Sequence, residues 1–298
     1  MFTGLSAFPL TPLANDAVDE PSFIRIIERL VASGTDSITA LGSTGSYAYL
    51  TGAERAQVAH LAVEHAGGTP VFIGVSALRT SQVMTNVKEA ERAGAAAVLL
   101  APMTYQALTA VDVLELYRAV SGSTDLPIIV YDNPATTHFT FTRELYGRIA
   151  QLPGIASIKI PGVPTDPVKA KEHLQAIRAV VPNHVTIGVS GDAFAATGLN
   201  AGCDAWYSVV GGTLPRLALG ITRPAQEGHA DEATAESERL APLWNLFTEF
   251  GGSLRVIAAI AEHLNLAQNK SLPMPIQGLN ESQRARVSEV VNALGLTE

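Results

Sequence analysis

One lysine of this sequence stands in surroundings that would make its amine reactive. The chain has five lysines, and only Lys159 lies within an apolar run, residues 155–161, that is typical of a buried strand. Burial disfavours the charged form of an amine and lowers its pKa. A neutral amine can attack a carbonyl carbon and form a Schiff base. We expect this role for Lys159, although a strand lysine can also reach solvent or join a structural ion pair.

Two further features follow neighbouring strand patterns. Tyr131 precedes Lys159 by 28 residues, the length of one strand–helix unit, so the two are expected at the same height on adjacent strands. A phenol there could carry protons to and from the reacting carbonyl, or could simply cap the barrel. Residues 42–45, Gly-Ser-Thr-Gly, offer hydroxyls and backbone N–H groups that suit a carboxylate. The same four residues could equally form only a turn.

The pattern of apolar runs predicts how these residues are positioned. Short apolar runs alternate with longer helical patterns, and parallel strands covered on both faces have this character. The runs begin near Leu5, Ser37, Val71, Ala97, Ile128, Ala156, Thr186 and Ala205. Eight such units predict an α/β fold, a (β/α)8 TIM barrel whose reactive groups lie at the carboxyl ends of the strands. A doubly wound sheet is the alternative, but no G-x-G-x-x-G motif follows the first run.

Helix boundaries and a C-terminal extension complete this expectation. Thr51 and Glu54 have the spacing of a capping box, and Thr80–Ser81 and Thr109 are expected to cap two further helices. After about residue 225 the alternation stops, and residues 229–250, 252–266 and 281–295 are predicted to be helices. We therefore expect a barrel over residues 1–224 and a helical extension, packed on it, over residues 225–298.

Composition excludes several classes of protein. Of 298 residues, 47% are apolar, which supports a large core and excludes bulk disorder. The net charge of −8, without a basic run, argues against nucleic-acid binding. No apolar stretch has the length of a membrane helix, and no signal-peptide pattern opens the chain. Cys203 is the only cysteine, so no internal disulfide is expected. A cytoplasmic enzyme is the resulting expectation.

Acidic and histidine side chains near the expected site do not suggest a metal. Asp132, His138 and Asp192 lack the spacing of a ligand set. We therefore predict no metal and no other cofactor.

Three of these motifs together resemble one family. The chain resembles the dihydrodipicolinate synthase / N-acetylneuraminate lyase family of class I pyruvate aldolases, over nearly its whole length. Residues 42–45 match its G-[ST]-T-G motif, residues 131–134 (Tyr-Asp-Asn-Pro) are similar to its Y-N-x-P motif, and Lys159 stands in its I-K strand. The resemblance implies a barrel with C-terminal helices, a homotetramer built as a dimer of dimers, and a Schiff base between Lys159 and a 2-oxo acid, most often pyruvate.

The resemblance also assigns roles within the site. Ser43 and Thr44 would bind the carboxylate of the 2-oxo acid. Tyr131 would relay protons, with Thr44 linking it to a tyrosine donated across a dimer interface. Either Thr104 or Tyr105 takes the place of that tyrosine, and we assign Tyr105.

Other positions bear on the substrate. Gly191 and Tyr207 correspond to positions near the bound keto acid. Thr136 stands where dihydrodipicolinate synthases carry an arginine that binds the carboxylate of the aldehyde substrate. A hydroxyl lacks the paired, charge-assisted bonds of a guanidinium. Ser46 replaces the family's usual glutamate, and residues 160–162 after Lys159 are not the polar residues typical of sialic-acid lyases.

These departures alter the expected substrate more than the expected reaction class. We expect a lysine Schiff-base lyase or aldolase for pyruvate or another 2-oxo acid, with a second substrate other than aspartate semialdehyde. Arg79 or Arg216 could still replace the missing arginine. A 2-keto-3-deoxy acid dehydratase or deaminase and dihydrodipicolinate synthase itself are alternatives within the family. A non-catalytic binding homologue is disfavoured, because Lys159, Tyr131 and Thr44 are all present.

Overall fold

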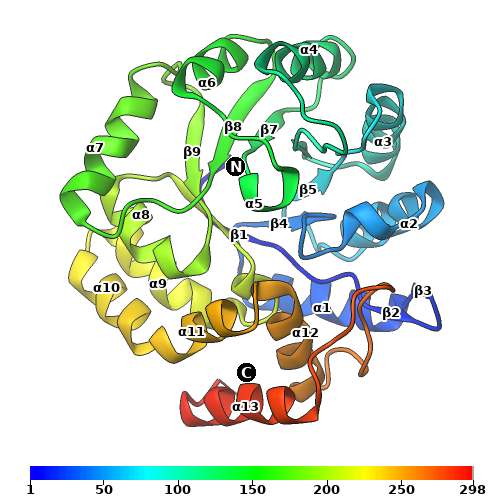
Figure 1. The fold of residues 1–298 in the computed structure, drawn as a ribbon, viewed down its shortest axis with the longest axis vertical. Helices are drawn as coiled ribbons and strands as arrows, with labels where there is room; N and C mark the ends of the chain where they lie inside the picture. Colours follow the sequence, from blue (N-terminus) through cyan, green and yellow to red (C-terminus); the bar gives the residue numbers. More distant parts are fainter. Residues whose placement is uncertain (297–298) are drawn as a thin grey trace.

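The computed structural model describes residues 1–296 and shows a closed barrel (Figure 1). Over these residues eight strands close the ring in sequence order, and every neighbouring pair is parallel. The strands are β1 (Gly4–Ala7), β4 (Ser37–Ala40), β5 (Val71–Gly74), β6 (Ala97–Leu100), β7 (Ile128–Tyr131), β8 (Ile155–Ile160), β9 (Thr186–Val189) and β10 (Ala205–Ser208). The predicted (β/α)8 barrel and all eight predicted strands are confirmed, and the doubly wound sheet is wrong.

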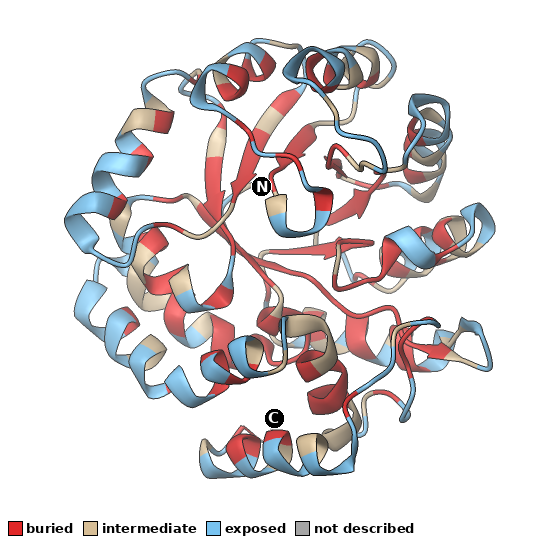
Figure 2. Ribbon diagram, in the orientation of Figure 1, coloured by how far each residue is buried: buried red, intermediate tan, exposed pale blue. Residues whose placement is uncertain are grey.

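Helices surround the barrel and leave its strands buried, as Figure 2 shows. They are α1 (Glu20–Ala32), α2 (Gly52–Glu64), α3 (Thr80–Ala93), α4 (Ala110–Ser121), α6 (Arg143–Ala150), α7 (Pro167–Arg178), α8 (Ala195–Ala201) and α9 (Pro215–Glu227). Short elements occupy the connections: β2 (Leu13–Ala14), β3 (Ala17–Val18), α5 (Pro134–Thr137) and the 3-10 turns η1 (Tyr47–Tyr49), η2 (Asp192–Phe194) and η3 (Val210–Gly212).

Capping bonds set several helix starts as predicted. Thr51 and Glu54 form the capping box of α2, and Thr109 caps α4 through a second box. The prediction for Thr80 is wrong: Arg79 is the extended residue before α3, and Thr80 is already the first helical residue. A side chain caps a helix only from the non-helical residue just before it, so Thr80 cannot serve.

The C-terminal region continues as helices: α10 (Ala230–Arg239), α11 (Ala241–Glu249), α12 (Ser253–His263) and α13 (Glu281–Ala293). The single helix predicted over residues 229–250 is wrong, because the chain bends at Leu240. Pro242 follows in the first turn of α11, where its missing N–H costs nothing, whereas inside one long helix its ring would clash with the preceding turn. Of these helices α10 packs against α8 and α9, and the four pack against one another. The boundary at residue 224 stays a prediction.

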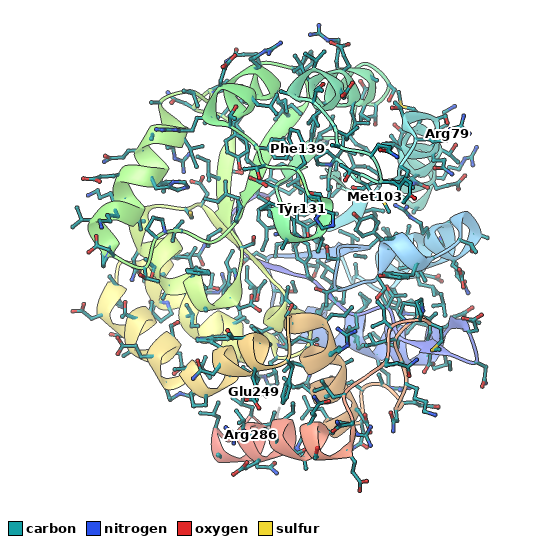
Figure 3. The ribbon with its side chains drawn as sticks, in the orientation of Figure 1. Arg79, Met103, Tyr131, Phe139, Glu249 and Arg286 are labelled. Atoms are coloured by element: carbon teal, nitrogen blue, oxygen red, sulfur yellow. The ribbon has the colours of Figure 1, made fainter. Side chains whose placement is uncertain are left out.

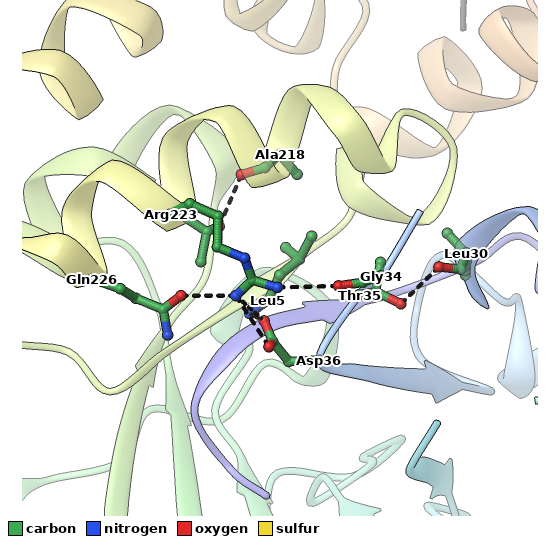
Figure 4. Close-up of polar contacts among 9 residues, drawn as sticks. Leu5, Leu30, Gly34, Thr35, Asp36, Ala218, Arg223 and Gln226 are labelled. Carbon is green, nitrogen blue, oxygen red and sulfur yellow. Dashed lines mark hydrogen bonds and ion pairs between the residues drawn. The ribbon is translucent and has the colours of Figure 1, made fainter. Parts of the chain in front are cut away.

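An ion pair at the amino ends of the strands ties the first and last barrel units together (Figure 4). Arg223 of α9 donates to both carboxylate oxygens of Asp36, at 2.8 and 3.1 Å, and to the carbonyl of Gly34. Asp36 also accepts the backbone N–H of Leu5 at 2.7 Å. These bonds link α9, β1 and the start of β4 at the closure of the ring, at the end opposite the one where the reactive groups are expected.

The barrel interior is a separate core of aromatic and small side chains. Its members are Phe8, Phe72, Ala97, Leu99, Ala101, Ile129, Tyr131, Ala205 and Tyr207. Filling the centre with side chains leaves no channel, so only groups at the carboxyl ends of the strands can meet a ligand. Within the described part of the chain, no helix combines the length and apolar character needed to cross a membrane.

Candidate active site

Lys159 lies inside the barrel near the end of β8. Its Cα pairs with that of Tyr131 on β7 and with that of Gly188 on β9, so the predicted adjacency of Lys159 and Tyr131 is confirmed. The amine lies 4.3 Å from the centre of the Tyr131 ring and 5.7 Å from that of Phe8. Lys159 is only 5% exposed and joins no salt bridge within residues 1–296, so neither the solvent-exposed nor the ion-paired alternative describes it.

Burial lowers the pKa of Lys159 to about 7. The carboxylates of Asp192 and Asp132 oppose this fall, since each favours the charged amine. A pKa near neutrality leaves a substantial fraction of the amine unprotonated at pH 7. The site therefore contains a nucleophile that needs no separate base to deprotonate it.

The Tyr131 phenol is held by two polar side chains. Its oxygen lies 2.9 Å from Ser43 Oγ and accepts a hydrogen bond from Asn133 Nδ2 at 2.9 Å. Asn133 Nδ2 also donates to Ser43 Oγ at 3.3 Å. Burial raises the pKa of Tyr131, and the bonds from Ser43 and Asn133 counteract that rise. The Thr44 side chain, also buried, makes no hydrogen bond within the described chain. The hydroxyl beside the phenol is therefore that of Ser43 and not that of Thr44.

Backbone conformation at two non-glycine residues shapes the 42–45 loop. Leu41 and Ser46, which bracket it, have φ of 59° and 54°, in the left-handed region that costs free energy for residues with a Cβ. A Cβ on Gly42 would lie 2.5 Å from the Phe8 ring, so only glycine lets the chain pass there. The loop is thus pressed against the interior aromatic core, beside Tyr131.

Buried Arg55 of α2 joins the end of β5 to Tyr47, just after the 42–45 loop. Its guanidinium donates to the carbonyls of Gly74 and Ser76, both at 2.8 Å, and lies 5.5 Å from the centre of the Tyr47 ring. Burial lowers the pKa of Arg55 to about 10 and raises that of Tyr47 to about 12. Because Tyr131 also raises the pKa of Tyr47, a second buried phenol lies within electrostatic range of the site.

Gly191 and Tyr207 lie on the other side of Lys159. Tyr207 donates to or accepts from Ser157 Oγ at 2.7 Å, and its ring covers Gly188, where an added Cβ would lie 2.3 Å from the ring. The Tyr207 hydroxyl is therefore already engaged two residues below Lys159 on β8. Gly191 has φ of 77°, which glycine adopts freely.

Two buried carboxylates near Lys159 hold structure in place. Asp192 accepts from Trp206 Nε1, Ser208 Oγ and the N–H groups of Val209 and Val210, at 2.8–3.2 Å, which joins the ends of β9 and β10. Burial raises its pKa to about 6 despite these donors.

Asp132 accepts a hydrogen bond from Tyr146 of α6, and burial raises its pKa to about 6 as well. Among residues 1–296, no three His, Cys, Asp or Glu side chains are grouped as metal ligands.

The other predicted residues are not brought to the amine. Tyr105 is 87% exposed on the loop between β6 and α4, and Thr104 donates to the carbonyl of Thr137 at 2.8 Å. Thr136 is exposed on α5. Figure 3 shows Tyr131 near the middle of the barrel and Arg79 at its outer edge over α3.

Asn133 is the site residue that sequence reasoning missed. A signal was present: side chains two residues apart on an extended chain share a face, and Asn133 follows Tyr131 by two. Asn133 also occupies the variable position of the Y-N-x-P motif, so the motif itself assigns it no role. The structure brings Lys159, Tyr131, Ser43 and Asn133 together.

Comparison with known proteins supports the resemblance. Residues 1–294 match the model of the dihydrodipicolinate synthetase family. The 4-hydroxy-tetrahydrodipicolinate synthase of Methylococcus capsulatus is 32% identical over 96% of both chains. A crystal structure of dihydrodipicolinate synthase from Agrobacterium tumefaciens matches with a TM-score of 0.94 and 43% identity over 98% of both chains. A family member from Escherichia coli K12, YagE in complex with pyruvate, has a TM-score of 0.90 at 22% identity and so shares the fold. The chain belongs to the dihydrodipicolinate synthetase family and is a class I, pyruvate-dependent lyase.

Proposed function

We propose that Lys159 forms a Schiff base with pyruvate or a related 2-oxo acid and that Tyr131 moves the protons of the reaction. The observation that carries this proposal is the buried amine, with its pKa of about 7, packed against the face of a hydrogen-bonded phenol. Ser43 and Thr44 bind the carboxylate of the 2-oxo acid. The Thr44 hydroxyl is available for this, because it makes no hydrogen bond within the described residues.

The steps balance with these groups alone. The neutral Lys159 amine adds to C2 of the 2-oxo acid and gives a carbinolamine. Tyr131 donates its phenolic proton to the carbinolamine hydroxyl, water leaves, and an iminium ion and a phenolate remain. The phenolate then removes a proton from C3 and yields a neutral enamine, the carbon nucleophile. The iminium nitrogen accepts the electrons, so the proposal requires no metal or other cofactor.

The first test is to trap the Schiff base. Borohydride reduction in the presence of pyruvate is expected to place the adduct mass on the peptide that contains Lys159, while the peptide with exposed Lys169 stays unmodified. The buried amine of Lys159, with its pKa lowered to about 7, is the proposed nucleophile, and the exposed Lys169 is the control. If a panel of 2-oxo acids leaves Lys159 unmodified, the proposal is wrong.

The rate of trapping should depend on pH as a neutral amine requires. Because the pKa of Lys159 is lowered, the reactive form dominates above about pH 7, and the rate is expected to fall about tenfold per unit below it. Asp132→Asn removes a charge that favours protonated Lys159, so the acid limb should move to lower pH. Asp125→Asn, on an exposed residue, serves as the control. An acid limb near pH 10 would contradict a lowered pKa.

We further propose that the second substrate is not aspartate semialdehyde. Thr136 is exposed and neutral, and its hydroxyl donates to the carbonyl of Asn133 at 3.4 Å. Arg79 lies at the edge of the molecule (Figure 3), where it cannot replace the missing guanidinium beside Tyr131. A sugar acid or a hydroxyproline-derived acid fits better, cleaved at a carbon–carbon bond or dehydrated through the same imine. Dihydrodipicolinate synthesis is the second candidate, favoured by the names of the relatives.

Condensation of pyruvate with aspartate semialdehyde, coupled to the next reductase, distinguishes the two. We expect low activity, since one neutral hydrogen bond replaces two charge-assisted ones, which lowers affinity roughly 10- to 100-fold. Thr136→Arg should raise kcat/KM about tenfold. Val168→Arg adds the same charge at an exposed residue of α7 and should not. A wild-type kcat/KM near about 10⁵ M⁻¹s⁻¹ would be that of an ordinary native substrate and would establish the second candidate.

We also propose a cytoplasmic homo-oligomer, a dimer of dimers. Tyr105, Tyr49 and Leu78 are large apolar side chains that are more than half exposed. They lie on the segments that border a hollow of about 290 Å³, lined by Leu78 and Met103 among others. Aromatic and Met side chains are enriched in interface cores, so a second subunit that covers this region would bury all of them.

Light scattering at micromolar concentration is expected to give the mass of a tetramer. Tyr105→Asp should shift the population toward smaller species, because a carboxylate buried in an interface is costly. Val168→Asp, at an exposed apolar residue of α7 outside this region, separates this contact from others. A monomer at all concentrations would contradict the proposal.

A further inference from the structure

Asn133 has the residue type and the position of a helix cap, yet its side chain does not cap the helix. It is the residue before α5, where asparagine normally accepts a hydrogen bond from the first turn. Within the described chain its side chain makes no such bond, and the first turn of α5 bonds instead to its backbone carbonyl. The side-chain amide is therefore free to turn toward the barrel.

Pro134, the next residue, favours this orientation of the Asn133 side chain. Pro134 disfavours the helical conformation for the residue before it, and Asn133 has φ of −146° and ψ of 73°. The backbone at Asn133 is thus not yet helical, and its side-chain amide reaches the Tyr131 hydroxyl. It donates to Tyr131 Oη at 2.9 Å and to Ser43 Oγ at 3.3 Å, and Ser43 lies 90 residues before Asn133 in the sequence.

The number of donors that Asn133 offers to Tyr131 and Ser43 matters for proton transfer. An amide nitrogen carries two N–H groups and no acceptor, so Asn133 supplies one donor to each of the two oxygens. Either hydroxyl, Tyr131 or Ser43, can then donate to the other across the 2.9 Å between their oxygens without breaking the bonds from Asn133. When Tyr131 has given up its proton, the N–H of Asn133 becomes a charge-assisted donor to the phenolate.

We propose that Asn133 is a positioning residue that stabilises the Tyr131 phenolate and aligns the phenol with Ser43. The inference rests on the proposed function, because it concerns the proton transfers of the Schiff-base reaction. A donor that strengthens when charge develops lowers the barrier selectively. Asn133 acts through Tyr131 and does not touch the substrate.

Exchange of the pyruvate methyl protons in D₂O tests this role without any second substrate. Formation of the enamine removes a C3 proton, and its reversal returns deuterium, which NMR detects. Asn133→Val removes both donors and is expected to slow exchange about 10- to 100-fold, the range for a hydrogen bond to a charged group. Borohydride should still trap the imine on Lys159, which also shows that the variant is folded.

Asn133→Asp keeps the shape but replaces the donor with an acceptor. It is expected to slow exchange at least as much as Asn133→Val, since a carboxylate beside Tyr131 opposes the phenolate. Asn200→Val is the matched control, because Asn200 also donates two side-chain bonds, to Ala230 and Thr234, but on the outer helices. Its exchange rate should equal that of the wild type.

A double-mutant cycle separates positioning from general structural support. In a Tyr131→Phe background, Asn133→Val is expected to cost less than about twofold further, because the group it serves is gone. Equal losses in both backgrounds, wild-type exchange in Asn133→Val, or wild-type exchange in Asn133→Asp would each overturn the role of Asn133 alone. A wild type that traps no 2-oxo acid and exchanges no protons would overturn the proposed function as well.

Discussion

The desolvation of one amine is the constraint on which the rest of the structure depends. Lys159 is enclosed by a ring of strands whose interior is packed with aromatic and small side chains. Burying an unpaired ammonium ion there costs free energy, so burial favours the neutral amine and lowers its pKa. The nearby carboxylates accept hydrogen bonds from other groups. Asp192 accepts hydrogen bonds from β10 and the turn after it, and Asp132 accepts one from α6. They moderate the pKa of the amine without forming an ion pair that would block it.

Strand pairing and side-chain contacts fix the positions of the residues around that amine. The phenol of Tyr131 lies beside the amine because β7 and β8 are paired in register, and Ser43 reaches it because two left-handed residues fold the 42–45 loop onto Phe8. Arg55 joins Tyr47, just after this loop, to the end of β5, and the ion pair of Arg223 with Asp36 links the first and last units at the opposite end. Strain at Leu41 and Ser46 is thus maintained by packing from several elements.

The buried side chains of the candidate site and the exposed loops around it are separated in space. The amine, the phenol and their hydrogen-bond partners lie at the ends of β4, β7 and β8, whereas Thr136 and Tyr105 lie on exposed connections above them. Connections of this kind vary freely without disturbing the barrel. A single fold can therefore keep the imine chemistry while the second substrate changes.

The sequence by itself determined the architecture and identified the one buried amine within the apolar strands. Alternating apolar runs, helix caps at Thr51 and Thr109, and one lysine in an apolar strand are local or periodic features, and local features can be read along the chain. The tertiary structure decided which hydroxyl meets Tyr131, that Asn133 turns to the site, and that residues 229–250 bend at Leu240. Ser43 and Thr44 are adjacent, and only the fold of the loop onto Phe8 selects between them. Asn133 and Ser43 are 90 residues apart, so their contact exists only because closing the barrel brings β4 and β7 around one centre.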